Sequence, residues 1–169
     1  MCLGLDCYDF AGTIRPLPLV SDWPSTNYHT YWRNDLAPFS EQQEYTLKSF
    51  FAIQDPCSRL IMWSNGDLST NMLLASYIVW YPGRFELRVT NVHELSVGTP
   101  LEDSSLLSST DWKAWLDGDL VRLLVVWKEG GVWVDMGTLL TRDISPLLEQ
   151  SSATRLPIPY RQASHHCPP

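Results

Sequence analysis

Asp119, Arg122 and Asp135 are the side chains in this sequence best suited to bind a phosphorylated sugar. Arginine presents a planar fork of N–H donors that fits the oxygens of phosphates and sugars. Aspartate carboxylates accept protons from hydroxyl groups and bind hard cations. If these three side chains converge, they would suit a ligand that carries both hydroxyl groups and phosphate.

The segment that carries Asp119 and Arg122 is predicted to be an amphipathic helix. Its apolar residues recur at offsets of three and four and would form one buried stripe, made of Leu116, Leu120, Leu123, Leu124 and Trp127. Asp119, Arg122 and Val126 then lie on a neighbouring face, where residues three apart are adjacent. Gly130 and Gly131 would end the helix, because glycine adopts the left-handed conformation common at helix C-termini.

A short buried strand is expected over residues 132–136. Successive side chains of a strand point to opposite faces, which puts Val132 and Val134 on one face and Trp133 and Asp135 on the other. Asp135 would therefore lie near the carboxyl end of a strand, where open α/β sheets bind their ligands.

Strands and helices alternate in the preceding part of the chain. Strands are expected at residues 28–32, 58–64 and 85–90, and helices at residues 39–55 and 71–80. This order is typical of a parallel sheet covered by helices on both faces, so the sequence predicts a three-layer α/β fold. Residues 138–144 are expected to be a strand or an extended segment that returns across the sheet.

Asp119, Arg122, Gly130, Gly131 and Asp135 occur in the order and spacing of a known family. On these residues the chain resembles glycosyltransferases with a DxD sugar-binding region, a group that includes Golgi α-1,6-mannosyltransferases and α-1,4-galactosyltransferases. The resemblance implies the nucleotide-diphospho-sugar transferase fold, which is GT-A and Rossmann-like. It also implies transfer of a hexose from a nucleotide-diphospho-sugar to a glycan, a glycolipid or a glycoprotein.

The resemblance also implies roles for individual residues. Asp119 and Arg122 match the helix pair that holds the donor sugar, and Asp135 matches the first aspartate of the DxD motif. His29 falls where the first strand of the family carries a histidine near the nucleotide, although an ordinary strand histidine bonded to backbone explains it equally well. No general base or nucleophile can be assigned.

Gly137 stands where the second DxD aspartate is expected, so binding of Mn²⁺ or Mg²⁺ should be weakened. Asp135, with water molecules and the diphosphate, could still hold a metal, because Mg²⁺ is often bound through one or two carboxylates. A literal DxD occurs at Asp117 and Asp119, but Asp117 is interpreted as a residue of the helix terminus or a solvated charge.

Composition limits the other possibilities. The formal net charge of −7 makes a nucleic-acid or anionic-membrane partner unsuitable. Cys2, Cys7, Cys57 and Cys167 are too irregularly spaced for a zinc motif. The sequence has no signal segment and no apolar run of the roughly 20 residues that a membrane span needs. A Golgi or membrane-associated location is implied only by the resemblance.

The chain divides into an irregular lead-in (1–27), a partial nucleotide-sugar-binding domain (28–150) and a tail expected to be disordered (151–169). The resemblance ends near residue 150, which suggests a truncated or alternatively spliced product. Two functions stay open: a metal-dependent hexosyltransferase domain, and an inactive remnant or nucleotide-sugar-binding module. A third possibility is that Asp119 and Arg122 form only a surface ion pair.

Overall fold

The computed structural model describes residues 26–108, 115–145 and 147–148, and these form a parallel sheet covered by helices. The strands are β1 (Asn27–Trp32), β2 (Arg59–Ser64), β3 (Phe85–Val89) and β4 (Val132–Trp133). The helices are α2 (Glu41–Ile53), α3 (Met72–Trp80), α4 (Val92–Ser96) and α5 (Trp115–Glu129), with a 3-10 turn η1 (Ser105–Ser108). The predicted tail at 151–169 and most of the predicted lead-in lie outside the described residues, and Asn27 already begins β1.

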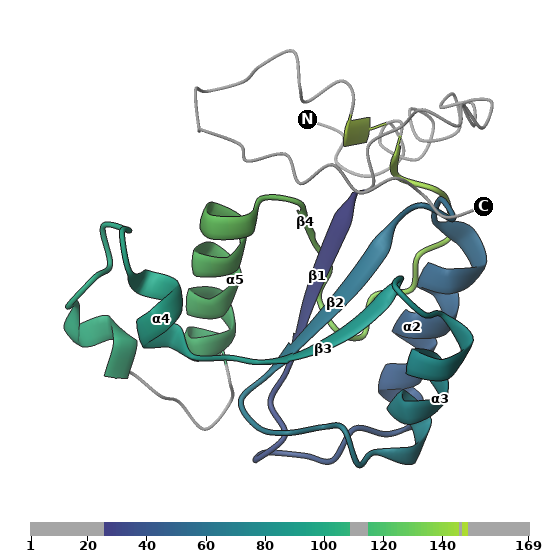
Figure 1. Ribbon diagram of the computed structural model, residues 1–169, viewed down its shortest axis with the longest axis horizontal. Helices are drawn as coiled ribbons and strands as arrows, with labels where there is room; N and C mark the ends of the chain where they lie inside the picture. The colour runs from purple at the N-terminus through teal and green to yellow at the C-terminus, as the bar shows by residue number, and fades with distance from the viewer. Residues whose placement is uncertain (1–25, 109–114, 146, 149–169) are drawn as a thin grey trace, which may run out of the picture.

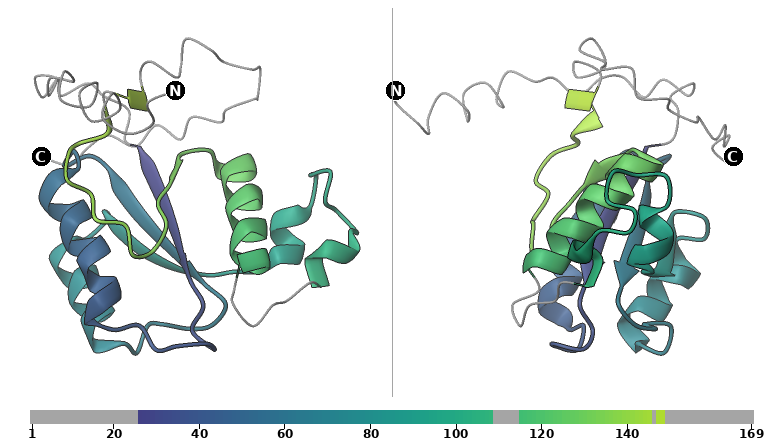
Figure 2. Two further views of the ribbon diagram at one scale, coloured as in Figure 1. Left: turned by 180° about the vertical axis from the view of Figure 1, so that it is seen from behind. Right: turned by 90° about the vertical axis from the view of Figure 1, so that its left-hand side faces the viewer.

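The sheet has the strand order β3-β2-β1-β4, and all three pairings are parallel. Helices α2 and α3 cover one face, and α4 and α5 cover the other (Figures 1 and 2). This arrangement confirms the predicted three-layer α/β class. It also brings the carboxyl ends of all four strands to one edge of the sheet, where loops can form a site.

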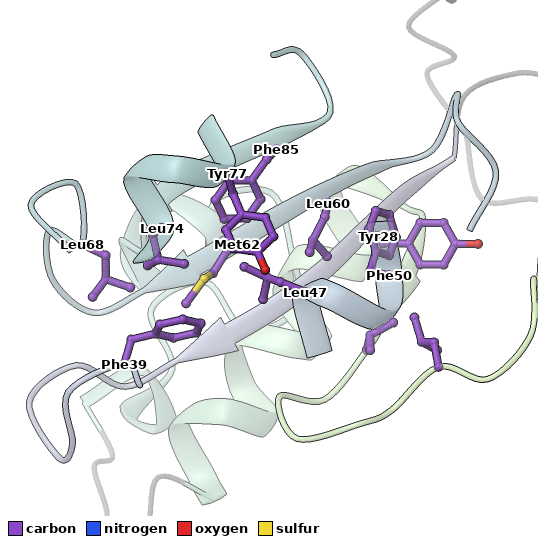
Figure 3. Close-up of a cluster of buried hydrophobic side chains, with 12 residues drawn as sticks. Tyr28, Phe39, Leu47, Phe50, Leu60, Met62, Leu68, Leu74, Tyr77 and Phe85 are labelled. Atoms are coloured by element: carbon purple, nitrogen blue, oxygen red, sulfur yellow. The ribbon is translucent and has the colours of Figure 1, made fainter. Parts of the chain in front are cut away.

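The core between the sheet and helices α2 and α3 is rich in large apolar side chains (Figure 3). Tyr28, Leu60, Met62 and Phe85 point from the strands toward Leu47 and Phe50 of α2 and Leu74 and Tyr77 of α3. Tyr28 packs edge-on against Phe50, with ring centroids 5.1 Å apart. The alternation expected along β1 and β2 therefore places one set of side chains in this core and the other set beneath α5.

The second core lies between the sheet and α5. The residues of α5 that it buries differ in part from the predicted apolar stripe. Leu120 and Leu124 are buried there as expected, but Leu123 and Trp127 are 62% and 54% exposed. Val121 and Val125 take their places in contact with Ile61 and Trp63 of the sheet. The face of α5 that carries Val121 and Val125 thus packs on the sheet. The side chain of Leu116, also in the predicted stripe, lies outside the described residues.

Strand β4 is shorter than predicted, because only Val132 and Trp133 pair with β1. The predicted alternation still holds, since Val132 and Val134 pack in the first core and Trp133 packs in the second. Gly131 allows this pairing. It has φ +82, and a Cβ there would lie 2.4 Å from the Asn27 carbonyl oxygen and 3.0 Å from His29 Nε2.

The extended segment after β4 runs along helix α2, whereas the prediction placed it across the sheet. The Gly137 N–H donates to Thr46 Oγ1 at 2.9 Å, and the Leu140 N–H donates to Ser49 Oγ at 3.1 Å. Gln54 then donates to the Arg142 carbonyl at 2.8 Å and accepts from the Ile144 N–H at 3.2 Å. Buried polar side chains of α2 and of its C-cap residue Gln54 thereby satisfy a backbone that has no strand partner.

Candidate functional site

A cleft of about 290 Å³ opens at the carboxyl edge of the sheet, between β1, β4 and the first turn of α5. From β1 and the loop after it come Tyr31, Trp32, Arg33, Leu36 and Ala37. From α5 and the end of β4 come Gly118, Asp119, Asp135 and Met136. The cleft therefore lies where parallel α/β sheets bind ligands, and it contains both predicted aspartates.

Arg122 connects the two aspartates that line the cleft. Its Nη2 donates to Asp119 Oδ1 one turn earlier in α5, and its Nη1 lies 3.6 Å from Asp135 Oδ1. The helix periodicity accounts for the first pair, and the pairing of β4 beside β1 accounts for the second. The three side chains predicted from the sequence do lie together in space.

Trp133 fixes the orientation of the Asp135 carboxylate. Its indole Nε1–H donates to Asp135 Oδ1 at 2.7 Å, because the two residues are separated by one position and point to the same side of the chain. The indole itself is anchored in the second core. Asp135 Oδ1 is thus held by Trp133 and Arg122, and the side chain remains 69% exposed.

A second charged group lies at the same edge and was not identified from the sequence. Arg33 Nη1 donates to Asp117 Oδ1 at 3.1 Å, and its Nε and Nη2 donate to both carboxylate oxygens of Asp35. These hydrogen bonds, those to Asp35 above all, raise the pKa of Arg33 above its ordinary value. Arg33 could have been found from its position directly after β1. The rule that ligands bind at the carboxyl ends of strands, which predicted Asp135, applies to Arg33 as well.

Asp117 lies in the first turn of α5, which confirms the predicted helix-terminus position, but it is not the solvated charge that was the alternative. Its side chain is only 13% exposed, and its Oδ2 also accepts a hydrogen bond from the Tyr31 hydroxyl at 3.3 Å. Burial, followed by the neighbouring Asp117 carboxylate, raises the pKa of Tyr31. Asp117 therefore links β1 to the start of α5 and bonds to Tyr31 and Arg33, which line the cleft.

His29 is not one of the described residues that line the cleft, although it lies on the same strand as Tyr31 and Trp32. It is fully buried in β1, and its Nδ1 accepts a hydrogen bond from Trp63 Nε1 at 3.1 Å. Burial, with a smaller contribution from the positive charge of Arg88, lowers the pKa of His29 to about 4. The structure thus places His29 in the packing between β1, β2 and Gly131, apart from the other three predicted site residues.

The residues at this edge do not by themselves fit a resident metal ion. Within the described ranges, no group of three or more His, Cys, Asp or Glu side chains could hold a metal. Gly137 has no side chain, so it adds no ligand beside Asp135. It has φ +99, and the space on its Cβ side is open. Asp119 and Asp135 are both paired with Arg122, so Mn²⁺ or Mg²⁺ would need further ligands, such as the phosphates of a bound substrate.

Residues 40–154 match the family model of the glycosyltransferase sugar-binding region containing a DXD motif. The match covers more than half of the chain, and the chain belongs to this family. The parallel α/β sheet agrees with the Rossmann-like, GT-A type of glycosyltransferase domain. The chain has no significant match to a curated protein or to a solved structure.

The family match begins after β1, so His29 and Arg33 lie outside the matched residues. Within the part of the chain that the structure describes, no helix is long and apolar enough to cross a membrane.

Proposed function

We propose that this protein is a glycosyltransferase domain whose cleft binds the sugar of a nucleotide-diphospho-sugar. In this proposal the hexose is transferred to a glycan, a glycolipid or a glycoprotein. The observation that carries it is the meeting of Arg122 with Asp119 and Asp135 beside a cleft at the carboxyl edge of the sheet. Membership of a sugar-binding glycosyltransferase family supports the same assignment.

Each of the three residues has a distinct part in the proposal. Asp119 and Asp135 accept hydrogen bonds from sugar hydroxyls, because each side chain is largely exposed and has an Oδ2 that no hydrogen bond within the described residues uses. Arg122 keeps the two carboxylates at a fixed separation and can donate its remaining N–H groups to sugar or phosphate oxygens. Gly118 leaves room beside Asp119, since it lines the cleft without a side chain. His29 has no part in this binding scheme.

Binding of Mn²⁺ or Mg²⁺ by the protein alone is proposed to be weak. Asp135 is the carboxylate at the motif position, and Gly137 supplies none. A Golgi location is proposed from the family.

A second candidate is a catalytically inactive module that binds a nucleotide sugar. The open, carboxylate-free position at Gly137 favours this alternative. Both candidates require donor binding in the cleft. They differ in whether transfer follows, so one titration and one product assay separate them.

The test is calorimetric titration of the full chain with UDP-hexoses and GDP-hexoses in the presence of Mn²⁺. We expect saturable binding of at least one donor, a clear loss of affinity for Asp119→Asn, and unchanged affinity for Asp103→Asn. Asp103 is a matched control because it is exposed, lies outside the cleft and has φ +60, a conformation that asparagine tolerates. Absence of binding for every donor would overturn both candidates, and binding without transfer or donor hydrolysis would select the inactive module.

A further inference from the structure

We infer that the cleft also binds a single hexose unit without nucleotide and without metal, provided that the sugar carries no negative charge. The inference rests on the proposed assignment of Asp119, Arg122 and Asp135 to a sugar. It goes beyond that assignment because it describes recognition of free carbohydrate, as in a lectin. It also ranks sugars by their charge.

The size of the cleft favours one sugar ring. Its volume is about 290 Å³, at the lower limit of the roughly 300–1,000 Å³ of sites that enclose drug-sized ligands. A complete nucleotide sugar, with its base, ribose, diphosphate and hexose, would extend well beyond this space. One monosaccharide can be enclosed by the lining residues alone.

The charges around the cleft favour a neutral or cationic ligand. Among the described residues, the charged groups that line it or bond to its lining are Asp35, Asp117, Asp119, Asp135, Arg33 and Arg122, with a formal charge of −2. Both arginines are already paired with aspartates, so neither offers an unopposed positive charge. An anionic ligand would meet net repulsion, whereas a hydroxylated neutral ligand would not.

The chemistry of the lining suits a sugar ring. Asp119 and Asp135 have side chains that are 63% and 69% exposed, and each has an Oδ2 that no hydrogen bond within the described residues uses. These oxygens are ready acceptors for hydroxyl groups. Trp32, Leu36 and Met136 provide apolar surface on the same cleft, against which the C–H groups of a ring can pack. Trp32 is held in place because its Nε1–H donates to the Ala37 carbonyl at 3.0 Å.

The experiment is an NMR titration of the full chain with methyl hexopyranosides of the gluco, galacto and manno series, with a chelator present. At least one should bind with a dissociation constant on the order of 1 mM, the range expected for a ligand of about a dozen heavy atoms. The corresponding methyl hexuronide should bind about tenfold more weakly at low salt, because its carboxylate faces the net negative cleft. The corresponding hexosamine, which is cationic, should bind at least as tightly as the neutral sugar. Asp119→Asn should weaken binding of the neutral sugar, and Asp103→Asn should leave it unchanged.

The outcomes separate this inference from the proposed function. If nucleotide sugars bind with Mn²⁺ while no free hexoside binds, the inference is overturned and the proposed function stands. If free hexosides bind while no nucleotide sugar does, the inference stands and the proposed function is overturned. Binding of the hexuronide as tightly as the neutral hexoside would also overturn the inference, because the charge argument would then be wrong.

Discussion

Arg122 Nη1 lies 3.6 Å from Asp135 Oδ1, although Arg122 belongs to α5 and Asp135 follows β4. The same guanidinium bonds to Asp119, so one arginine separates two carboxylates at the edge of the cleft. Without it, two like charges would face each other across the site. We therefore expect the loss of Arg122 to change the affinity for a ligand more than it changes the free energy of unfolding.

Replacing Arg122 by alanine is expected to weaken donor binding about 10- to 100-fold, the effect of losing a hydrogen bond to a charged group. The free energy of unfolding should change by less than about 1 kcal/mol, because exposed ion pairs contribute little. Calorimetry and urea unfolding measure the two effects. Lys48→Ala is the control for donor binding, since exposed Lys48 pairs with the buried Glu44 on α2, outside the cleft. Equal donor affinity for the wild-type protein and Arg122→Ala would contradict the assignment.

Gly137→Asp restores a carboxylate two residues after Asp135. Its Cβ would meet open space, but the φ of +99 is a conformation that residues with a Cβ rarely adopt, so some loss of stability is expected. We expect the affinity of the protein alone for Mn²⁺ to rise about tenfold, equivalent to about 1.4 kcal/mol. Titration with Mn²⁺ checks this, with Gly83→Asp as control because Gly83 also has positive φ and open space. An unchanged affinity would show that Gly137 does not limit metal binding.

Gly131→Ala should destabilise the fold by about 2–4 kcal/mol, through the unfavourable backbone conformation and a close contact. The added Cβ would lie 2.4 Å from the Asn27 carbonyl oxygen, which cannot move without disturbing β1. Gly98→Ala, at a similar φ of +78 but in open space, should cost only about 1 kcal/mol. Urea unfolding of both variants measures the difference. Equal costs would mean that β4 does not approach β1 as closely as described.

His29 should make stability depend on pH. In the unfolded chain it has its ordinary pKa of 6.5, whereas burial lowers the folded value to about 4. As pH falls below 6.5, the unfolded state gains a proton that the folded state does not bind until pH 4, so the stability present at neutral pH is lost across this window. The loss between pH 7 and pH 5 should be about 2 kcal/mol.

The variant His29→Gln tests this origin, since glutamine can still accept the hydrogen bond from Trp63 Nε1. Urea unfolding of the wild-type protein and the variant at both pH values gives the comparison. The pH-dependent loss should be smaller by about 2 kcal/mol in the variant. Identical pH dependence in the two proteins would contradict a buried, neutral His29.

Gln54 should hold the segment after β4 against α2. Gln54→Leu removes the hydrogen bonds of Gln54 to the Arg142 carbonyl and the Ile144 N–H and should cost about 2 kcal/mol. Amide hydrogen exchange at Ile144 should accelerate. Gln42→Leu is the control, because Gln42 is exposed on the same helix. Unchanged exchange at Ile144 would indicate that other contacts hold this segment.

The sequence predicted the parts of the fold that depend on local pattern. The alternation of strands and helices gave the parallel sheet, and the helix periodicity placed Asp119 beside Arg122. The rule for carboxyl strand ends placed Asp135 at the same edge. These inferences need only the neighbours of each residue along the chain.

The remaining features depend on contacts between distant residues. The buried face of α5 was mispredicted because Val121 and Val125 fit a helical stripe as well as Leu123 and Trp127 do, and only packing on Ile61 and Trp63 decides between them. Asp117 was correctly placed at the helix terminus, but its ion pair was not predicted because its partner Arg33 lies 84 residues earlier. The path of the last described segment depends on Thr46 and Ser49, polar helix residues whose buried partners the sequence does not indicate.

We propose that Asp119, Arg122 and Asp135 form one sugar-binding site in the cleft. NMR mapping of backbone amide shifts during titration with a UDP- or GDP-hexose and Mg²⁺ tests it most directly. We expect the largest shifts to cluster at Gly118, Asp119, Arg122, Asp135 and Met136. Saturable shifts that cluster elsewhere, with these five amides unchanged, would contradict it.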